Sequence, residues 1–174
     1  MRFKKPKFWD RKKKTFWSIL LFPVSVLYLL ILWITRIPSI FKTFKKRSII
    51  ICVGNIYIGG TGKTPLALEL FKIVKSLGKK PSFIKKYYIS VIDEIRMLRD
   101  VGETIDTKKR EEAIKISESK GFDVAILDDG FQDFSIKPDL SILCFNSKQL
   151  VGNGLTIPAG PLREGLGSIS RANC

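Results

Sequence analysis

The feature that most constrains the fold is a glycine-rich stretch that follows an apolar run and precedes an amphipathic segment. Residues 53–65 read Val-Gly-Asn-Ile-Tyr-Ile-Gly-Gly-Thr-Gly-Lys-Thr-Pro. The run before it, 48–52, is rich in β-branched residues and predicts a buried strand. The segment after it, 66–77, has apolar residues at helical spacing and stops at Gly78, so it predicts a helix. A strand, a glycine-rich turn, Gly-Lys-Thr and a helix in this order predict a loop that binds nucleotide phosphates.

The chemistry of this loop predicts ATP and Mg²⁺ as its ligands. Lys63 is expected to reach the β- and γ-phosphates, and the Thr64 hydroxyl is expected to hold Mg²⁺. The helix N-terminus adds partial positive charge to the backbone N–H groups of the loop. The nucleotide-binding residues that we expect besides Lys63 and Thr64 are Tyr57, Ile58, Gly59, Gly60, Thr61 and Gly62. Tyr57 stands where the usual spacing has glycine, and the alternative is a glycine-rich loop that only turns the chain.

The charge of the chain is concentrated at its N-terminal end. Residues 1–47 hold 13 of the 31 Lys and Arg and the single acid Asp10, a net charge of +12, which leaves +3 for the rest. We therefore expect a basic N-terminal segment and no nucleic-acid partner. The chain has no histidine, which excludes histidine bases and most zinc sites. Its three cysteines are far apart, as is typical of a reduced compartment.

Residues 16–34 are apolar apart from two serines, and basic clusters flank them. These residues could just cross a hydrocarbon core of about 30 Å. A single span would carry the larger basic cluster across the membrane, against the positive-inside tendency. We therefore favour a helix that lies in the cytoplasmic leaflet, with both flanks on anionic headgroups and a bend at Pro23. A cleaved signal peptide and a helix buried in a soluble core are the weaker alternatives.

The rest of the chain predicts further strands and helices in alternation. Strands are expected at 80–84, 122–127 and 139–145, and helices after Asp93-Glu94 and over 107–120. The predicted fold is α/β and P-loop NTPase-like, with a mainly parallel sheet flanked by helices and a membrane-associated N-terminal helix. We expect two parts, a membrane anchor over 1–47 and a P-loop kinase lobe over 48–174. The segment Lys85-Lys86-Tyr87-Tyr88 is expected to be a basic, aromatic turn beside the ligand, or a plain solvated loop.

Two carboxylates follow the apolar run 122–127. Asp128 and Asp129 stand where a phosphate-loop protein carries its magnesium-organising acid, although such a pair also occurs in simple turns. A Gly- and Pro-rich stretch, 152–161, leads directly into Arg163-Glu164. That stretch predicts either a rigid pocket wall that clamps a polar group or a plain connector.

Several of these separated motifs resemble the tetraacyldisaccharide 4'-kinases, the lipid A 4'-kinases of Gram-negative bacteria. The matching motifs are Val53-Gly54-Asn55 with Gly59-Gly60-Thr61-Gly62-Lys63-Thr64-Pro65, Asp128-Asp129-Gly130-Phe131-Gln132, and Gly152-Asn153-Gly154 through Pro158-Ala159-Gly160-Pro161-Leu162-Arg163-Glu164. The resemblance implies a P-loop kinase that transfers the γ-phosphoryl group of ATP to the 4'-hydroxyl of tetraacyldisaccharide 1-phosphate. It also implies a glycolipid substrate, an anionic membrane surface and the cytoplasmic face of the inner membrane.

The resemblance also implies roles for individual residues. The catalytic residues would be Lys63, Asp93, Asp128 and Asp129, with Asp93 matching the family's catalytic aspartate. Thr64 and Asp128 would hold the metal. The residues near the sugar headgroup of the substrate would be Asn55, Arg163 and Glu164.

The sequence departs from the family pattern at three places. Lys85-Lys86-Tyr87-Tyr88 replaces Ser-Arg-Gly-Tyr-Gly, Ile92 replaces the glycine before Asp93, and Asp133 stands where a histidine usually does. The family also continues for another lobe of similar size, so we expect residues 48–174 to correspond to its N-terminal lobe and to transfer little phosphate alone. The alternative functions are a membrane-associated partition-type ATPase and a non-enzymatic truncated remnant.

Overall fold

The structure is a computed structural model that describes residues 5–11, 13, 15–40, 44–88 and 91–174. A parallel sheet of five strands, in the order β3-β2-β4-β1-β5, forms its centre. The strands are β1 (Ile49–Gly54), β2 (Pro81–Lys86), β3 (Thr104–Thr107), β4 (Val124–Asp128) and β5 (Leu140–Leu143). The α-helices are α1 (Phe16–Leu20), α2 (Phe22–Ile40), α3 (Lys63–Ser76), α4 (Ile92–Arg99) and α5 (Arg110–Ser119), and the 3-10 helices are η1 (Lys7–Asp10) and η3 (Leu166–Arg171). The predicted α/β fold with a parallel sheet is confirmed.

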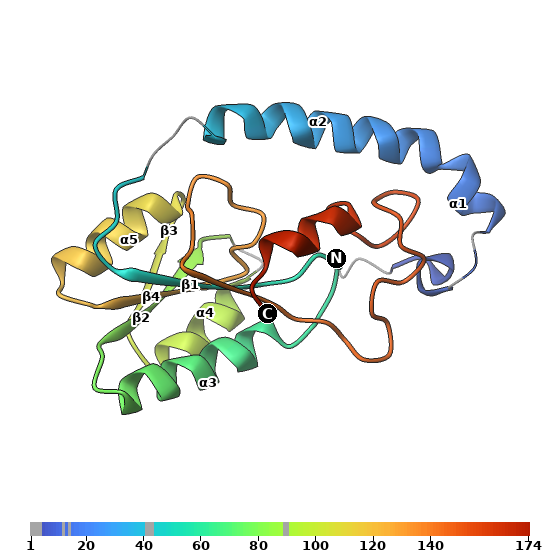
Figure 1. Cartoon of the computed structure of the whole chain (residues 1–174). Helices are drawn as coiled ribbons and strands as arrows, with labels where there is room; N and C mark the ends of the chain where they lie inside the picture. The colour runs from blue at the N-terminus through green and yellow to red at the C-terminus, as the bar shows by residue number, and fades with distance from the viewer. Residues whose placement is uncertain (1–4, 12, 14, 41–43, 89–90) are drawn as a thin grey trace.

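Helices cover both faces of the sheet (Figure 1). Alternate residues of β1 point to opposite faces, as in any strand. Ile50 and Cys52 belong to the core cluster on the α5 side, whereas Ile51 and Val53 belong to the cluster that includes buried residues of α3 and α4. β1 is thus buried on both faces, which explains its nearly continuous run of apolar residues.

The phosphate loop connects the interior strand β1, which lies between β4 and β5, to α3. α3 begins at Lys63, earlier than the predicted helix, and Gly62 precedes it in the left-handed conformation with φ of 81°. A residue with a side chain is strained in that conformation, so glycine suits this position. α3 packs through Ala67, Phe71 and Val74, which are buried against the sheet.

The N-terminal helices lie across the side of the molecule opposite α3 (Figure 1). The predicted apolar helix is interrupted at Leu21, two residues before Pro23, and α2 then extends to Ile40. The hydroxyl of Ser25 donates a hydrogen bond to the carbonyl of Thr156 at 2.9 Å, and Tyr28 donates one to the carbonyl of Arg163 at 2.8 Å. One face of α2 is therefore fixed to the loop after β5.

The segment before α1 is also packed against this loop. Trp9, in η1, is 3% exposed, and its indole N–H donates to the carbonyl of Pro158 at 3.0 Å. The backbone N–H of Asn153 donates to the carbonyl of Trp9 at 2.9 Å. The N-terminal segment and the loop after β5 therefore form one packed layer.

Two predicted elements were placed wrongly. Residues 85–88 are not all a turn, because Lys85 and Lys86 complete β2 and pair with β3. The helix predicted over 107–120 starts at Arg110, because Thr107 ends the short strand β3.

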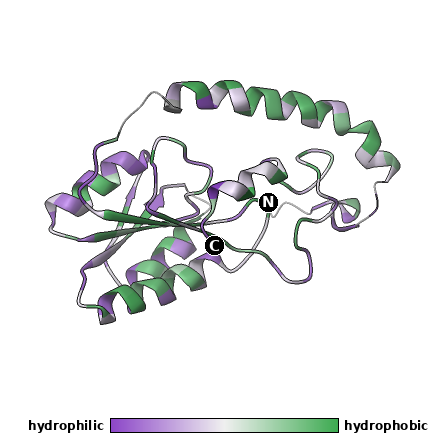
Figure 2. Cartoon of the chain, in the orientation of Figure 1, coloured by the Kyte–Doolittle hydropathy of each residue, from purple (hydrophilic) through white to green (hydrophobic). Residues whose placement is uncertain are grey.

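Most of α2 is coloured as hydrophobic in Figure 2, and many of its large apolar side chains are exposed. Phe22, Leu27, Ile31 and Trp33 are between 47% and 63% exposed. Within the described part of the chain, the structure contains no helix with the length and apolarity that crossing a bilayer requires. Some residues of the predicted basic flanks lie outside the described residues, namely Arg2, Lys4, Lys12, Lys14 and Lys42.

Candidate active site

The side chain of Asn55 forms hydrogen bonds with several residues of the phosphate loop. Its side chain is fully buried, and its amide nitrogen donates to the carbonyl of Tyr57 at 2.7 Å and to the hydroxyl of Thr61 at 3.0 Å. A third, longer contact of 3.3 Å reaches the carbonyl of Gly59. Asn55, predicted to bind substrate, thus supports the shape of the phosphate loop through its amide nitrogen.

Thr64 and Asp128 come together as predicted. The Thr64 hydroxyl, in the first turn of α3, donates to Oδ2 of Asp128 at 3.1 Å. Asp128 ends β4, the neighbour of β1, and is fully buried. Because the carboxyl ends of parallel strands meet at one edge of the sheet, residues 64 positions apart in sequence become neighbours.

Lys63 faces Asp129, the next residue of the acidic pair. The Lys63 ammonium lies 3.6 Å from Oδ1 of Asp129. Nη1 of Arg163 lies 3.1 and 3.2 Å from the two oxygens of the same carboxylate. Burial alone would raise the pKa of Asp129, but Lys63 and Arg163 outweigh that effect and lower it below 3.8. Asp129 is therefore an anion that positions two cations at the phosphate loop.

Lys85, expected in a basic turn beside the ligand or in a solvated loop, is a buried cation at the site. Its ammonium lies 2.5 Å from Oδ2 of Asp128 and also contacts the carboxylate of Glu94, in the first turn of α4. Burial alone would lower the pKa of Lys85, but Asp128 and Glu94 outweigh it, and the pKa lies above 10.5. Lys85 is thus charged at neutral pH and directly neutralises the metal-side acid.

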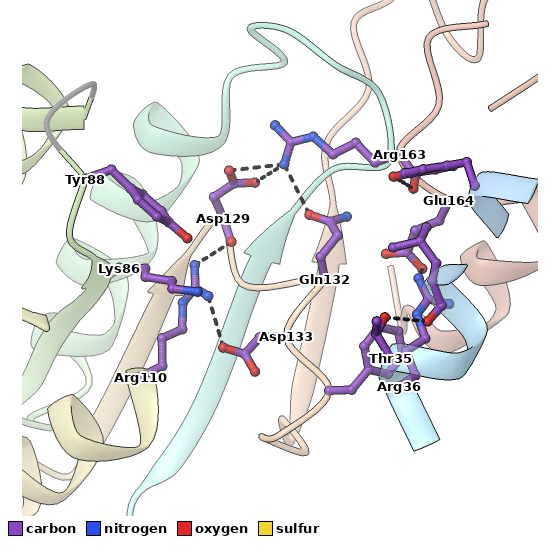
Figure 3. A pocket seen from close by; sticks show the side chains of 13 residues that line it. Thr35, Arg36, Lys86, Tyr88, Arg110, Asp129, Gln132, Asp133, Arg163 and Glu164 are labelled. Carbon is purple, nitrogen blue, oxygen red and sulfur yellow. Dashed lines mark hydrogen bonds and ion pairs between the residues drawn. The ribbon is translucent and has the colours of Figure 1, made fainter. Parts of the chain in front are cut away.

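A cavity of about 560 Å³ opens beside these residues, between α2 and the sheet. Figure 3 shows Lys86, Tyr88 and Arg110 on one side of it and Arg163, Glu164 and Arg36 on the other. Asp129, Gln132 and Asp133, from the loop after β4, lie between these two sides. The cavity is therefore polar and lined by several cations next to the phosphate loop.

Arg110 is another lining residue that the sequence reasoning missed. It starts α5, and its Nη2 donates to the carbonyl of Asp129 at 2.7 Å. Its Nη1 pairs with Oδ2 of Asp133 at 3.1 Å. Burial alone would raise the pKa of Asp133, but Ser135 and Arg110 lower it below 3.8. The aspartate that replaces the family's usual histidine is thus an anion that helps to fix Arg110.

Glu164 was predicted to lie near the substrate, and it lines the cavity as the centre of a charge cluster. Its side chain is 1% exposed, and Oε2 pairs with Arg36 at 2.9 Å and with Arg171 at 2.5 Å. Both guanidinium groups lie 4.2 Å from the ring centroid of Phe134. Glu164 therefore connects α2 to η3 as well as forming part of the cavity wall.

Two predicted site residues do not join the group. Tyr57 is 1% exposed, and its hydroxyl donates to the carboxylate of Asp10 and accepts from Lys5 at 2.9 Å, so its partners lie in the N-terminal segment. The carboxylate of Asp93 is 98% exposed, and its nearest cation is Arg96, at 3.9 Å. Within α4, it is Glu94 and not Asp93 that reaches the site, where it contacts the buried ammonium of Lys85.

The residues present fit a magnesium ion. Oδ1 of Asp128 is buried and has no hydrogen-bond partner among the described residues. The Thr64 hydroxyl lies on the other oxygen of the same carboxylate. Hydroxyl and carboxylate oxygens beside a phosphate loop are ligands of the kind that Mg²⁺ takes in such proteins, with the nucleotide and water completing the shell.

The sheet is parallel, a Gly-Lys-Thr loop follows its interior strand β1, and a buried aspartate lies beside the loop's threonine. These features define a P-loop nucleotide-binding protein. The sequence profile of LpxK, described as tetraacyldisaccharide-1-P 4'-kinase, matches residues 17–107 and 91–174. The chain belongs to the tetraacyldisaccharide 4'-kinase family.

Individual relatives agree with this assignment. The tetraacyldisaccharide 4'-kinase of Pelagibacter ubique (strain HTCC1062) is 48% identical over 169 residues, which cover 97% of this chain and 53% of that protein. The corresponding protein of Allorhizobium ampelinum is 33% identical, over 95% of this chain and 52% of that protein. The chain spans about half the length of the curated relatives it matches.

A solved structure shows the same fold. LpxK from Aquifex aeolicus, described as an "apo" form in complex with ATP, matches with a TM-score of 0.75 and 28% identity. The match covers 89% of this chain and 56% of that chain.

Proposed function

We propose that residues 1–174 form the ATP-binding part of a kinase that phosphorylates the 4'-hydroxyl of tetraacyldisaccharide 1-phosphate in lipid A biosynthesis. The observation that carries the proposal is the contact of 3.1 Å between the hydroxyl of Thr64 and the buried carboxylate of Asp128, directly beneath a phosphate loop. The relatives named tetraacyldisaccharide 4'-kinase support the acceptor.

The residues of the loop divide the work of binding the donor. The backbone N–H groups of 59–62 and the ammonium of Lys63 bind the phosphates, and Asp129 holds that ammonium in place. Thr64 and Asp128 hold Mg²⁺, which when bound neutralises charge on the β- and γ-phosphates. Phosphoryl transfer depends mainly on such positioning and charge neutralisation, so no covalent enzyme intermediate is needed.

The cavity beside the loop suits an anionic sugar headgroup. Lys86 lies on its wall, and among the described residues no carboxylate pairs with it. Its ammonium lies 5.5 Å from the ring centroid of Tyr88. An ammonium without a carboxylate partner can bind a phosphate, and an aromatic ring beside it can pack against the face of a sugar. We place the disaccharide headgroup here, against Lys86 and Arg163.

We propose that the exposed apolar side chains of α2 contact the acyl chains of the substrate and of the membrane. This helix exposes many large apolar side chains, and a large apolar patch on a protein surface marks a lipid or protein interaction site. Basic residues flank it in the sequence, as they do in helices that lie in an anionic leaflet. We propose that α1 and α2 lie in the cytoplasmic leaflet of the inner membrane, which brings the cavity to the lipid surface.

Nucleotide binding is tested by calorimetric titration of the 174-residue chain with ATP in the presence and absence of Mg²⁺. We expect Mg²⁺-dependent binding that Lys63→Ala abolishes while its circular dichroism spectrum stays unchanged. Lys79→Met, at an exposed lysine before β2, is the matched control and should bind as the parent does. Unchanged affinity in folded Lys63→Ala would refute the phosphate-loop assignment.

Transfer is tested with the chain joined to the remaining C-terminal portion of the Pelagibacter ubique relative. We expect ATP-dependent phosphorylation of tetraacyldisaccharide 1-phosphate by the joined protein and little by residues 1–174. ATP hydrolysis that proceeds equally well without the glycolipid would instead support the partition-type ATPase.

Membrane binding is tested by sedimentation with vesicles that contain phosphatidylglycerol. Leu27→Asp and Ile31→Asp, both on the exposed face of α2, should release the protein from the vesicles. An exposed apolar residue elsewhere, Ile73→Asp on α3, is the control and should leave binding intact. Equal binding of all three variants would contradict the proposed position of α2 in the membrane.

A further inference from the structure

Lys85 is a buried charge that the phosphate-binding motif does not require. It lies at the carboxyl end of β2, beside β4, and its side chain is 3% exposed. The ammonium has two carboxylate partners on different elements, Asp128 at 2.5 Å and Glu94. A buried lysine is stable only when its charge is compensated, so these contacts decide where the ammonium lies.

The carboxylate of Asp128 is paired with Lys85 and is also the proposed ligand of Mg²⁺, so both cations interact with the same negative charge. Its Oδ2 accepts from both Lys85 and Thr64, and its Oδ1 is buried without a hydrogen-bond partner among the described residues. A site that holds a divalent cation does so more weakly when the charge of its carboxylate is already compensated. The ammonium of Lys85 therefore opposes metal binding at Asp128 while stabilising the metal-free form of the protein.

Glu94 acts in the opposite sense. Its carboxylate is 48% exposed and contacts the same ammonium from the α4 side. Glu94 compensates part of the charge of Lys85, so Lys85 reduces the attraction between Asp128 and a metal ion by a smaller amount. Asp128, Lys85 and Glu94 thus form a chain of alternating charges that runs from the phosphate loop to α4.

We propose that Lys85 is a positioning residue that acts through Asp128 to set the concentration of Mg²⁺ that nucleotide binding requires, with Glu94 reducing its effect. The inference rests on the proposed function, because it assigns Mg²⁺ and ATP to the phosphate loop. It predicts changes of opposite sign when the two outer members of the chain are neutralised.

The test measures ATP affinity of the 174-residue chain by calorimetry over a series of free Mg²⁺ concentrations. Lys85→Met should lower the half-saturating Mg²⁺ concentration about tenfold, equivalent to ~1.4 kcal/mol. Glu94→Gln should raise it about threefold, less than the first change because Glu94 is partly solvated. Lys85→Arg, which keeps the charge, should stay close to the parent.

A double variant identifies the route of the effect. If Lys85 acts through Asp128, Lys85→Met should change the Mg²⁺ requirement little when Asp128→Asn is already present. A purely structural role for Lys85 would instead weaken nucleotide binding in both single variants. Glu94→Gln changes a partly exposed residue, so it keeps the test decisive even where Lys85→Met does not fold.

The outcomes separate this inference from the proposed function. A parent chain that binds ATP without any Mg²⁺ dependence overturns the metal site and this inference with it. A parent that shows the dependence, together with a Glu94→Gln variant whose Mg²⁺ requirement is unchanged or lower, overturns the role of Lys85 alone.

Discussion

The guanidinium of Arg36 lies 2.9 Å from the carboxylate of Glu164, whose side chain is 1% exposed. This ion pair joins α2 to the loop that carries Arg163, so it connects the helix to the wall of the cavity. Arg171 pairs with the same carboxylate, and Phe134 lies against both guanidinium groups. Glu164 is therefore the shared partner of two cations in a largely buried cluster.

Neutralising Glu164 should destabilise the protein more than removing either cation. Glu164→Gln leaves two guanidinium groups without their carboxylate and should cost roughly 3–5 kcal/mol in the free energy of unfolding. Arg36→Met leaves Glu164 paired with Arg171 and should cost about 1 kcal/mol, because Arg36 is partly exposed. Urea denaturation measures both, with the exposed pair Lys72 and Glu69 as a control that should contribute almost nothing. An equal loss in the two variants would contradict a shared partner.

Removing the Asn55 amide should weaken ATP binding without unfolding the sheet. Asn55→Ala deletes the hydrogen bonds that fix the carbonyl of Tyr57 and the hydroxyl of Thr61. The loop then has to be ordered by the nucleotide itself, and we expect about a tenfold loss of affinity, or ~1.4 kcal/mol. Asn146→Ala, in the loop after β5, removes a local amide contact far from the phosphate loop in sequence and serves as the control. Full ATP affinity in Asn55→Ala would show that the loop keeps its shape without this residue.

The contribution of Asp133 to stability should disappear in acid. Its folded-state pKa lies below the ordinary value of 3.8, because Ser135 and Arg110 outweigh the effect of burial. A lowered pKa adds stability that is complete above about pH 3.8 and is lost as the pH falls through the folded-state value. Asp133→Asn should therefore be less stable than the parent at pH 7, and the difference should shrink as the pH falls below about 3.8. A difference in unfolding free energy that stays constant down to pH 2 would contradict this assignment.

The Cys52 thiol should be inert in the folded protein. Burial raises its pKa to about 12, so it is protonated at neutral pH and is also shielded from reagent. Cys174 is exposed and should react quickly with an aromatic disulfide reagent. We expect Cys52 to react only when urea unfolds the sheet, and a Cys144→Ser/Cys174→Ser double variant isolates its signal from those of the other two free thiols. Rapid reaction of Cys52 in native buffer would mean that the β1 core opens readily.

The strands and helices with strong apolar patterns could be predicted from the sequence. β1, α3 and β4 lie within a few residues of their predicted positions, because each has a long apolar run or a helical period that no other structure satisfies. β3 could not be found in this way. Only Ile105 of its four residues is buried. The segment forms a strand because its backbone pairs with the edge of β2.

The local part of the site was predictable and the long-range part was not. Lys63 and Thr64 follow from one motif, and Asp128 follows from the end of a buried strand. Lys85 was expected in a turn beside the ligand or in a solvated loop, whereas it continues β2. Its partners Asp128 and Glu94 come from other elements, and its place at the carboxyl end of β2 is the signal that could have revealed this. Arg110 had no signal of its own, since its partners come from a loop that follows another strand.

The buried position of Trp9 has a practical consequence for protein production. A version of the chain that starts after the apolar helices, to improve solubility, would uncover the surfaces that Trp9 and Ser25 now cover around Pro158 and Ala159. It would also remove Asp10 and Lys5, the two partners of the Tyr57 hydroxyl at the base of the phosphate loop. Detergent or lipid nanodiscs with residues 5–40 retained are therefore the better route to a sample whose nucleotide loop keeps its native shape.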